Sequence, residues 1–426
     1  MKYEIHIESE KDYDVIVVGS GPSGIAAALT AGRLGARTLI VESCGRVGGI
    51  STAGMMSHFT GTVGNAIYAE VLNRADEKNR YKRKEKKWID PELLTLTYIE
   101  MLEEANVDIL LYTTFCDAVM HENTLSGIIC HNKSGFSLLR AKAFVDATGD
   151  GDVAFRSGAA FIKGRESDGK MQPATLMFKI GGVDTERAVF PGSFESLVPT
   201  EKGELQALAS KHLPHPAGHV LLYPSTLPGI VTVNMTNVTE IDGTRAEDLT
   251  RAEIVCRRQM PLIVDFLREF APGYENCYII GSASLIGIRE TRHFKGIKAL
   301  TEEDCSEARQ HEDAVVFDAY FNFDVHNISG SGLDKTGCQH GFMQTKGYTI
   351  PYGCLVPEKI DGLLLCGRNI SGTHMAHSNF RAMPICMGIG EAAGAAAALA
   401  IKQRIAVRDL DPTEIRAHIV KAKKES

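Results

Sequence analysis

Residues 19–24, Gly-Ser-Gly-Pro-Ser-Gly, follow the spacing G-x-G-x-x-G. In such a turn the first glycine permits a sharp bend, the second lets the backbone approach a pyrophosphate, and the third lets a helix pack on a strand. Glu42 lies 18 residues after Gly24, where a carboxylate can bind the hydroxyls of an adenosine ribose. The pattern predicts a dinucleotide site and does not by itself choose between NAD and FAD. A tight turn without a ligand is the alternative.

A second group of polar residues lies near the end of the chain, in "THMAHSNFR" at 373–381. His374 and His377 suit proton transfer because imidazole titrates near neutrality. The alternative is that they are ordinary hydrogen-bonded histidines that shape a turn. Arg381 could bind a substrate carboxylate or pair with Glu391, and the sequence does not separate these two roles.

A third polar group is "GIRETRHF", which follows an apolar segment. Arg289 is the candidate for orienting an anionic or polyhydroxy substrate, and an ion-paired seam between domains is the alternative. His58 and His326 are weaker candidates for the same site. The acidic residues show no metal-ligand spacing, so no metal site is expected.

The elements that must position these residues are visible in the apolar pattern. Residues 15–18 and 38–41 are predicted buried parallel strands, and 25–34 between them is a predicted helix, which together make a βαβ unit. "AFVDATG" and "GLLLCGR" are further buried strands that end in glycine. After Arg381, a run of small and apolar residues predicts a buried helix with Pro384 in its first turn.

The composition changes after about residue 160, where strands of a different sheet and a long amphipathic helix at 245–270 are predicted. Asp248 or Thr250 is the expected cap of that helix. We therefore expect an α/β fold, with a discontinuous Rossmann-like FAD/NAD(P)-binding domain and an inserted α+β substrate domain. The expected ranges are 1–163 and 342–426 for the first domain and 164–341 for the second.

Composition excludes several classes of protein. The net charge of −7 over 426 residues argues against a general nucleic-acid binder. None of the ten cysteines forms C-x-x-C, which argues against a thioredoxin-type dithiol, a zinc ribbon or a clustered iron–sulfur centre. No apolar run is long enough to predict a membrane span, and the start lacks the apolar core of a signal peptide. A cytoplasmic protein is expected.

Three further motifs carry a resemblance to a known family. They are Gly48-Gly49 in "RVGGISTAG", Thr148-Gly149 in "AFVDATGDGD", and Gly367 in "LLLCGRN". With the first glycine turn, this series resembles flavoproteins of glutathione-reductase-like FAD fold. Within them it is similar to FAD-dependent oxidoreductases related to fumarate reductase and heterodisulfide-reductase-like flavoproteins. The resemblance spans roughly residues 13–402 and indicates a bacterial branch with largely undefined substrates.

The resemblance implies FAD as the cofactor and assigns residues to it. Those at the pyrophosphate, ribose and adenine are Gly19, Gly21, Pro22, Ser23, Gly24, Glu42, Ser43 and Phe115. Those towards or beside the flavin are Arg46, Gly48, Gly49, Ile50, Ser51, Thr148, Gly149, Asp150, Gly367, Met383, Pro384 and Ile385. Many relatives have an aspartate after the late glycine. Arg368 stands there in this chain, and it would pair with a phosphate or a substrate anion.

The implied activity is hydride transfer between flavin N5 and a small polar organic substrate. The alternatives are an electron-transfer subunit that works with a protein partner, and a flavin-bound non-redox enzyme. A separate NAD(P)H domain is not expected, because no second G-x-G-x-x-G follows a strand. The substrate, the electron acceptor, the direction of transfer and the choice between dehydrogenase, reductase and oxidase stay open. A homo-oligomer is allowed.

Overall fold

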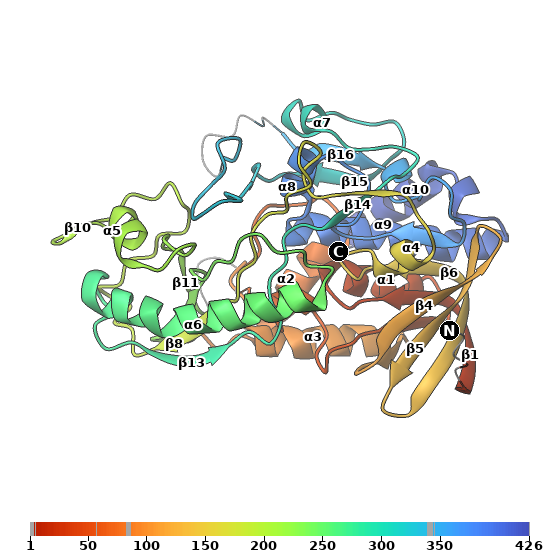
Figure 1. The fold of residues 1–426 in the computed structure, drawn as a ribbon. Coiled ribbons are helices and arrows are strands. Elements are labelled where there is room, and N and C mark those ends of the chain that lie inside the picture. The colour runs from red at the N-terminus through yellow and green to blue at the C-terminus, as the bar shows by residue number, and fades with distance from the viewer. Residues whose placement is uncertain are drawn as a thin grey trace.

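The computed structural model describes residues 4, 6–56, 58–81, 87–338, 344 and 346–425. Within these ranges the largest sheet has seven strands, in the order β3-β2-β1-β6-β5-β4, with β17 also paired to β6. In that order the first six are Asp108–Leu110, Thr38–Val41, Ile7–Val18, Gly135–Asp146, Thr124–Asn132 and Thr114–His121, and β17 is Leu363–Leu365. Segments from both ends of the chain therefore share one sheet (Figure 1).

Strand β6 joins the two ends of the chain. One of its edges pairs in parallel with β1 along most of its length. The other edge pairs first with β5, antiparallel, and then with β17, in parallel through Phe144 to Asp146. Strands β2 and β17 and the last four residues of β1 and of β6 are buried, which is why these segments are mostly apolar. The predicted Rossmann-like sheet is confirmed.

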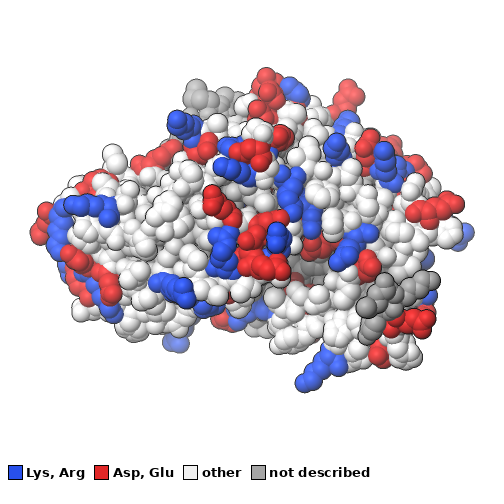
Figure 2. Space-filling model, in the orientation of Figure 1, with Lys and Arg blue, Asp and Glu red and all other residues white. Residues whose placement is uncertain are grey.

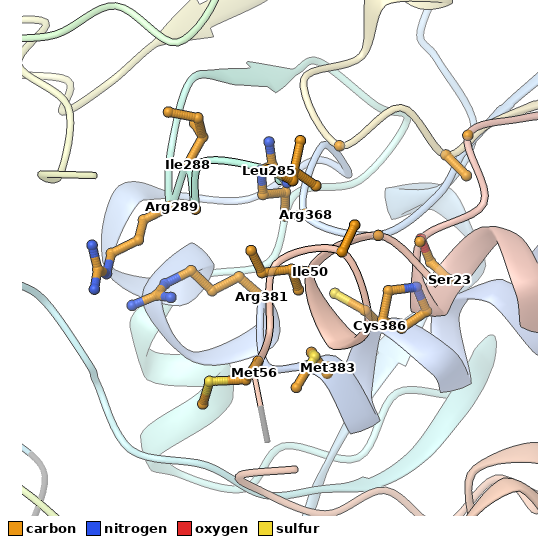
Figure 3. A pocket seen from close by; sticks show the side chains of 18 of the residues that line it. Ser23, Ile50, Met56, Leu285, Ile288, Arg289, Arg368, Arg381, Met383 and Cys386 are labelled. Carbon is orange, nitrogen blue, oxygen red and sulfur yellow. The ribbon is translucent and has the colours of Figure 1, made fainter. Parts of the chain in front are cut away.

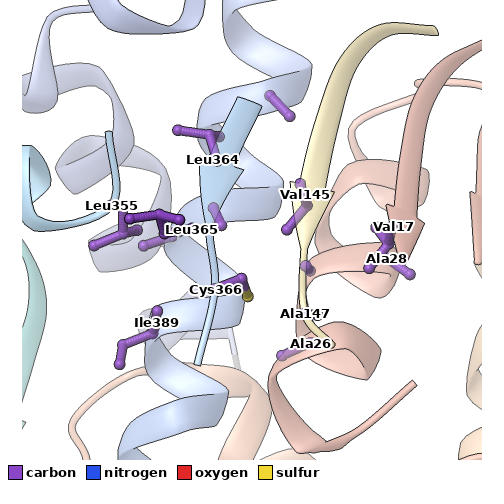
Figure 4. Close-up of a cluster of buried hydrophobic side chains, with 14 of the residues drawn as sticks. Val17, Ala26, Ala28, Val145, Ala147, Leu355, Leu364, Leu365, Cys366 and Ile389 are labelled. Carbon is purple, nitrogen blue, oxygen red and sulfur yellow. The ribbon is translucent and has the colours of Figure 1, made fainter. Parts of the chain in front are cut away.

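Helix α1 (Pro22–Arg33) lies against helix α9 (Met383–Gln403), and both cover the parallel strands (Figure 4). A Cβ atom on Gly390 would overlap with the carbonyl oxygen of Ser23, and one on Gly394 would overlap with that of Ala27. The two helices thus touch backbone to backbone. Helix α9 is long and apolar enough to span a membrane, contrary to the expectation from sequence, but 89% of its apolar window is buried inside the protein. It is a core helix.

The remaining elements around this sheet are short strand pairs and helices. The longer helices are α2 (Ala66–Lys78), α3 (Pro91–Glu104) and α10 (Pro412–Glu425). The short helices are α4 (Asp152–Arg156), α7 (Glu302–Ser306) and α8 (His374–Phe380), with 3₁₀ turns at 49–51, 352–354 and 407–409. The two antiparallel pairs are β7 (Phe161–Lys163) with β14 (Arg292–Phe294), and β15 (Ala314–Ala319) with β16 (Tyr348–Pro351).

A second unit lies beside the first, at the left of Figure 1. Its antiparallel sheet has the order β11 (Leu222–Pro224), β12 (Val231–Val233), β8 (Phe178–Gly181) and β13 (Tyr278–Ser282). Helices α5 (Leu205–His212) and α6 (Ala246–Phe270) and the hairpin β9 (Pro199–Thr200) with β10 (Gly203–Glu204) complete it. Residues 174–283 supply its separate apolar core. The boundary at 163/164 stays a prediction, and the one at 341/342 lies outside the described residues.

The expected cap of α6 is wrong. The helix begins at Ala246, so Arg245 is its N-cap residue. The Arg245 side chain makes no capping hydrogen bond to the first turn among the described residues. Asp248 instead accepts a hydrogen bond from the backbone N–H of Asp242 at 3.0 Å, and Thr250 donates to the carbonyl of Ala246. Both residues thus lie inside the first turns, where their side chains bond to neighbouring backbone.

Glu391 is buried in α9 and does not pair with Arg381. Its Oε2 accepts a hydrogen bond from the backbone N–H of Ile67 at 3.0 Å, at the start of α2. Burial raises the pKa of Glu391 to about 7, although the backbone N–H groups of Ile67 and Ala66 act in the opposite direction. The carboxyl therefore satisfies an orphan donor of a helix N-terminus and is costly to ionise there.

Replacement of Gly390 by alanine tests the contact between α1 and α9. Helix propensity alone would stabilise the variant by about 1 kcal/mol. The overlap with Ser23 should instead destabilise it, by about 1–3 kcal/mol as in overpacked cores. Urea unfolding of both proteins measures the sign. A variant as stable as the wild type, or more stable, would contradict the close contact.

The Glu391→Gln variant tests the buried carboxyl. An acid with a raised pKa in the folded state stabilises the fold below its unfolded pKa, near 4.5, and that stability is lost as the pH rises through about 7. The wild type should therefore lose up to roughly 3 kcal/mol relative to the variant between about pH 4.5 and pH 7.5. Urea midpoints across this range measure the difference, and parallel pH profiles would refute the assignment.

Candidate active site

A single cavity of about 1420 Å³ extends between the two units. Its lining includes the carboxyl ends of β1, β2 and β6, the residue Arg368 beyond β17, and the start of α9. Ligands of open parallel sheets bind at this edge. The volume exceeds the roughly 300–1,000 Å³ of common small-molecule pockets, so a dinucleotide and a second molecule can share it.

The three glycines of the first motif have different surroundings. A Cβ atom on Gly19, whose φ is 94°, would overlap with the carbonyl of Ala147, and one on Gly24 would overlap with the carbonyl of Gly19. A Cβ atom on Gly21 would meet none of the described atoms within 4 Å, and Gly21 lines the cavity. Gly19 and Gly24 are thus needed for packing, whereas Gly21 leaves its space to a ligand.

The start of α1 is open to that ligand. Gly21 is its capping residue, and no side chain of the described chain caps the first turn. The backbone N–H groups there carry the positive end of the helix dipole, which favours phosphate oxygens. The glycine turn therefore fits a pyrophosphate.

Glu42 is held firmly at the end of β2. Its Oε2 accepts hydrogen bonds from the backbone N–H of Ser20 at 2.9 Å and from the Ser20 hydroxyl at 2.7 Å. Its Oε1 accepts from the backbone N–H of Cys44 at 2.9 Å. The carboxylate also lines the cavity, so it is fixed in the place where a ribose would meet it.

The structure brings most of the residues assigned to FAD to the cavity wall. Those that line it are Gly19, Gly21, Pro22, Ser23, Glu42, Ser43, Arg46, Gly49, Ile50, Phe115, Thr148, Gly149, Asp150, Arg368 and Met383. Those that do not line it are Gly24, Gly48, Ser51, Gly367, Pro384 and Ile385. Pro384 does lie in the first turn of α9, as predicted, and its missing N–H is no loss there.

Arg368 differs from expectation in its partner. Its Nη2 donates a hydrogen bond to Oδ1 of Asp150 at 2.6 Å, and the Thr291 hydroxyl donates to the same oxygen at 2.7 Å. Arg368 is thus paired with a carboxylate of the protein, and its pairing with a phosphate or a substrate anion stays a prediction. It links the end of β17 to the loop after β6.

The far end of the cavity holds a charged group made of Arg289, Arg381 and Asp324. Figure 3 shows the two guanidinium groups extending to the same side, away from Ser23. Arg381 donates to the Asp324 carboxylate at 2.9 Å and to its backbone carbonyl at 2.7 Å. Arg289 donates to the carbonyl of Pro173 at 2.5 Å. Two cations against one described carboxylate leave this end positive.

Burial and proximity shift the pKa values of this group. Burial and the nearby Arg381 lower the pKa of Arg289 to about 10, so it stays charged at neutral pH. Burial opposes ionisation of Asp324, but its hydrogen bond with His326 and the charges of the two arginines overcome it and hold its pKa below the usual range. Burial lowers the pKa of His326, 3.4 Å from Asp324, to about 4. The imidazole is neutral, and the net charge remains positive.

His374 and His377 are not brought to the cavity wall in the described chain. They lie on α8, a helix of their own, and both are buried. His374 Nδ1 is 2.6 Å from Oε1 of Glu290, and the His377 ring lies 4.5 Å from that of His293, centre to centre. The spacing of three residues places both histidines on one face of the helix. The sequence does not show what that face contacts, because Glu290 lies 84 positions from His374.

Several lining residues were not singled out from sequence. Tyr223 lies in β11, Thr175 precedes β8, and Asn234 follows β12. Asn234 donates to the Tyr223 hydroxyl at 3.4 Å, and burial raises the pKa of Tyr223 to about 12. His58, a weaker candidate already named from the sequence, lines the same wall against the rings of Trp88 and Tyr223. In the sequence these residues are marked only as polar side chains in or beside apolar segments. Such side chains are common in strands that have no functional site.

Solved structures share this fold. A geranylgeranyl bacteriochlorophyll reductase-like protein from Thermoplasma acidophilum aligns with 98% of this chain and 84% of its own, at 13% identity and a TM-score of 0.50. The p-nitrophenol 4-monooxygenase PnpA of Pseudomonas putida DLL-E4 aligns with 98% and 88%, at 12% identity and 0.51. The flavin-dependent brominase Bmp2 aligns with 97% and 84%, at 12% identity and 0.50. At such identities the likeness is one of fold alone.

A family model described as FAD dependent oxidoreductase matches residues 14–419, nearly the whole chain. The open cradle at Gly21 and the fixed carboxylate of Glu42 fit the cofactor in that description. The expected family, the enzyme class and FAD as cofactor are therefore confirmed. The protein belongs to the FAD-dependent oxidoreductase family.

Proposed function

We propose that this enzyme transfers a hydride between FAD and a small organic anion bound by Arg289 and Arg381. The observation that carries the proposal is one cavity with the open glycine turn at Gly21 at one end and the arginine pair at the other. FAD, when bound, accepts or donates the hydride at flavin N5. In this proposal the residues 1–163 and 342–426 bind the cofactor, and 164–341 supply most of the substrate side.

The proposed cofactor contacts begin at the first glycine turn. The N–H groups at the start of α1 would bind the pyrophosphate, and Glu42 would bind the adenosine ribose. The start of α9 adds a second helix N-terminus to the cavity. Its N-cap residue is Ala382, which makes no side-chain capping hydrogen bond in the described chain. Its dipole would favour negative charge beside Met383, where the flavin end is expected.

The proposed substrate contacts lie beyond the flavin end. Arg289 and Arg381 would bind a carboxylate or similar anion, and the bond from Arg381 to Asp324 fixes one guanidinium in place. Tyr223 stays protonated at neutral pH, so its hydroxyl can donate a hydrogen bond to the substrate. His374 and His377 would act indirectly, by holding the segment that carries Arg381.

The alternative of a protein electron-transfer partner has less support. On the face drawn in Figure 2, acidic and basic side chains are interspersed, which gives a partner no single charge to recognise there. Anaerobic mixing of the holoenzyme with small carboxylic acids and their neutral amides tests the proposal. Bleaching of the flavin absorbance by an acid, or reoxidation of the reduced flavin by one, supports it. Turnover that persists with a redox-inert flavin analogue would instead indicate non-redox chemistry.

The Gly21→Val variant tests the cofactor cradle. Its side chain enters space that the described chain leaves empty, so the protein should fold normally and lose most of its FAD. Gly24→Ala is the matched comparison, because its side chain overlaps with Gly19 and should lower stability as well. Flavin content and thermal unfolding of the apoproteins separate the two effects. Normal flavin content in Gly21→Val would contradict the cradle.

Substitution of the arginine pair tests the anion site. Arg289→Gln and Arg381→Gln should each weaken the binding of acetate or succinate by about 10–100-fold, since a charged hydrogen bond contributes about 1.5–3 kcal/mol. Perturbation of the flavin absorbance measures binding, and acetamide serves as the neutral ligand. Arg257→Gln, an exposed arginine on α6, is the control. Equal anion binding by the wild type and all three variants would contradict the assignment of Arg289 and Arg381 to the anion site.

A further inference from the structure

Four buried residues behind the arginine pair form a cluster that the hydride transfer does not use. Glu290 Oε1 lies 2.9 Å from Nε2 of His293 and 2.6 Å from Nδ1 of His374. The ring of His377 packs against that of His293. As far as the structure describes the cavity lining, it includes none of the four. The cluster is therefore separate from the flavin cavity.

Three of these residues lie close enough together to bind one metal ion. One ligand atom from each of Glu290, His293 and His377 lies within 4.8 Å of the other two. Ligand atoms about 2.1 Å from a tetrahedral ion lie roughly 3.4 Å apart, so small side-chain rotations would close the site. The set of two imidazoles and one carboxylate is typical of zinc and non-haem iron sites.

Two buried nitrogen atoms of the cluster lack hydrogen-bond partners among the described residues. The Nδ1 atoms of His293 and His377 are buried and have no hydrogen-bond partner among the described residues. Both side chains are almost wholly inaccessible, at 4% and 1% exposure. A buried polar atom without a partner is costly, and coordination of an ion is one way to satisfy it. This observation is independent of the spacing of the three ligands.

We propose that Glu290, His293 and His377 bind a divalent transition-metal ion of the class that prefers imidazole, such as Zn²⁺ or Fe²⁺. Hard cations such as Mg²⁺ prefer oxygen ligands and do not suit this set. The sequence pattern predicted no metal site, because the ligands come from segments more than 80 residues apart. The structure joins the E-x-x-H pair at 290–293 to a histidine of α8.

The surroundings support such a site. His374 bonds to Oε1 of Glu290, and the backbone N–H of Gln172 donates to Oε2 at 3.1 Å. Outer hydrogen bonds of this kind orient ligating carboxylates. Arg289 is the neighbour of Glu290, and Arg381 follows His377 by one helical turn. The ion would thus tie together the two segments that carry the arginine pair, as a positioning element outside the flavin cavity.

Metal analysis of the FAD-loaded enzyme tests the proposal. The holoenzyme is treated with a chelator, dialysed anaerobically against Zn²⁺, Fe²⁺ or Mg²⁺, and assayed for bound metal by mass spectrometry. We expect one Zn²⁺ or Fe²⁺ per chain and no retained Mg²⁺. His377→Gln and His293→Gln should lose this ion. His374→Gln should weaken its binding by about 10–100-fold, as loss of an outer partner does.

The control is His219→Gln, which removes another buried histidine with an unpartnered Nδ1, outside the cluster. It should keep the ion. Flavin content and circular dichroism identify any variant that fails to fold, and the wild-type measurement stands without the variants. A wild type that retains neither Zn²⁺ nor Fe²⁺ overturns the proposal, as does equal retention by His377→Gln, His293→Gln and wild type. Neither result bears on hydride transfer.

Discussion

The backbone contact between α1 and α9 is the constraint on which the rest of the structure depends. Gly390 and Gly394 lie against the carbonyls of Ser23 and Ala27, and any side chain at either position would overlap with them. This contact packs the C-terminal part of the chain against the sheet that contains the N-terminal strand β1. As a result, the glycine turn before α1 and the first turn of α9 reach the same cavity.

The sheet makes the same connection through β6. Because β1 and β17 pair in parallel with this strand on opposite edges, the carboxyl ends of all three strands lie at the same edge of the sheet. The loops that follow β6 and β17 carry Asp150 and Arg368, which are bonded to each other. Residues more than 200 positions apart are thereby fixed at the wall of one cavity. The segment between them is free to build a second unit with its own core.

Electrostatics divides the polar residues of this region into two groups. Asp324 holds Arg381 at the cavity wall and lies beside His326, so one carboxylate offsets only part of the charge of the arginine pair. Glu290 instead contacts His293 and His374 in the interior of the protein. Each carboxylate thus belongs to a different group: Asp324 to the charged wall of the cavity, and Glu290 to the buried histidine cluster. The two groups are distinct although Arg289 and Glu290 are neighbours in sequence.

The sequence by itself determined the Rossmann-like fold and its glycine turn, because a strand, a glycine turn and a helix interact within about thirty residues and leave a local pattern. Only the tertiary structure decided where the histidines and arginines lie relative to the cavity. Six of the seven residues of α8 are buried, so its periodicity gives no sign of which face meets the cavity. The orientation of α8 depends on Glu290, some 84 positions away, and no local pattern records a contact at that distance.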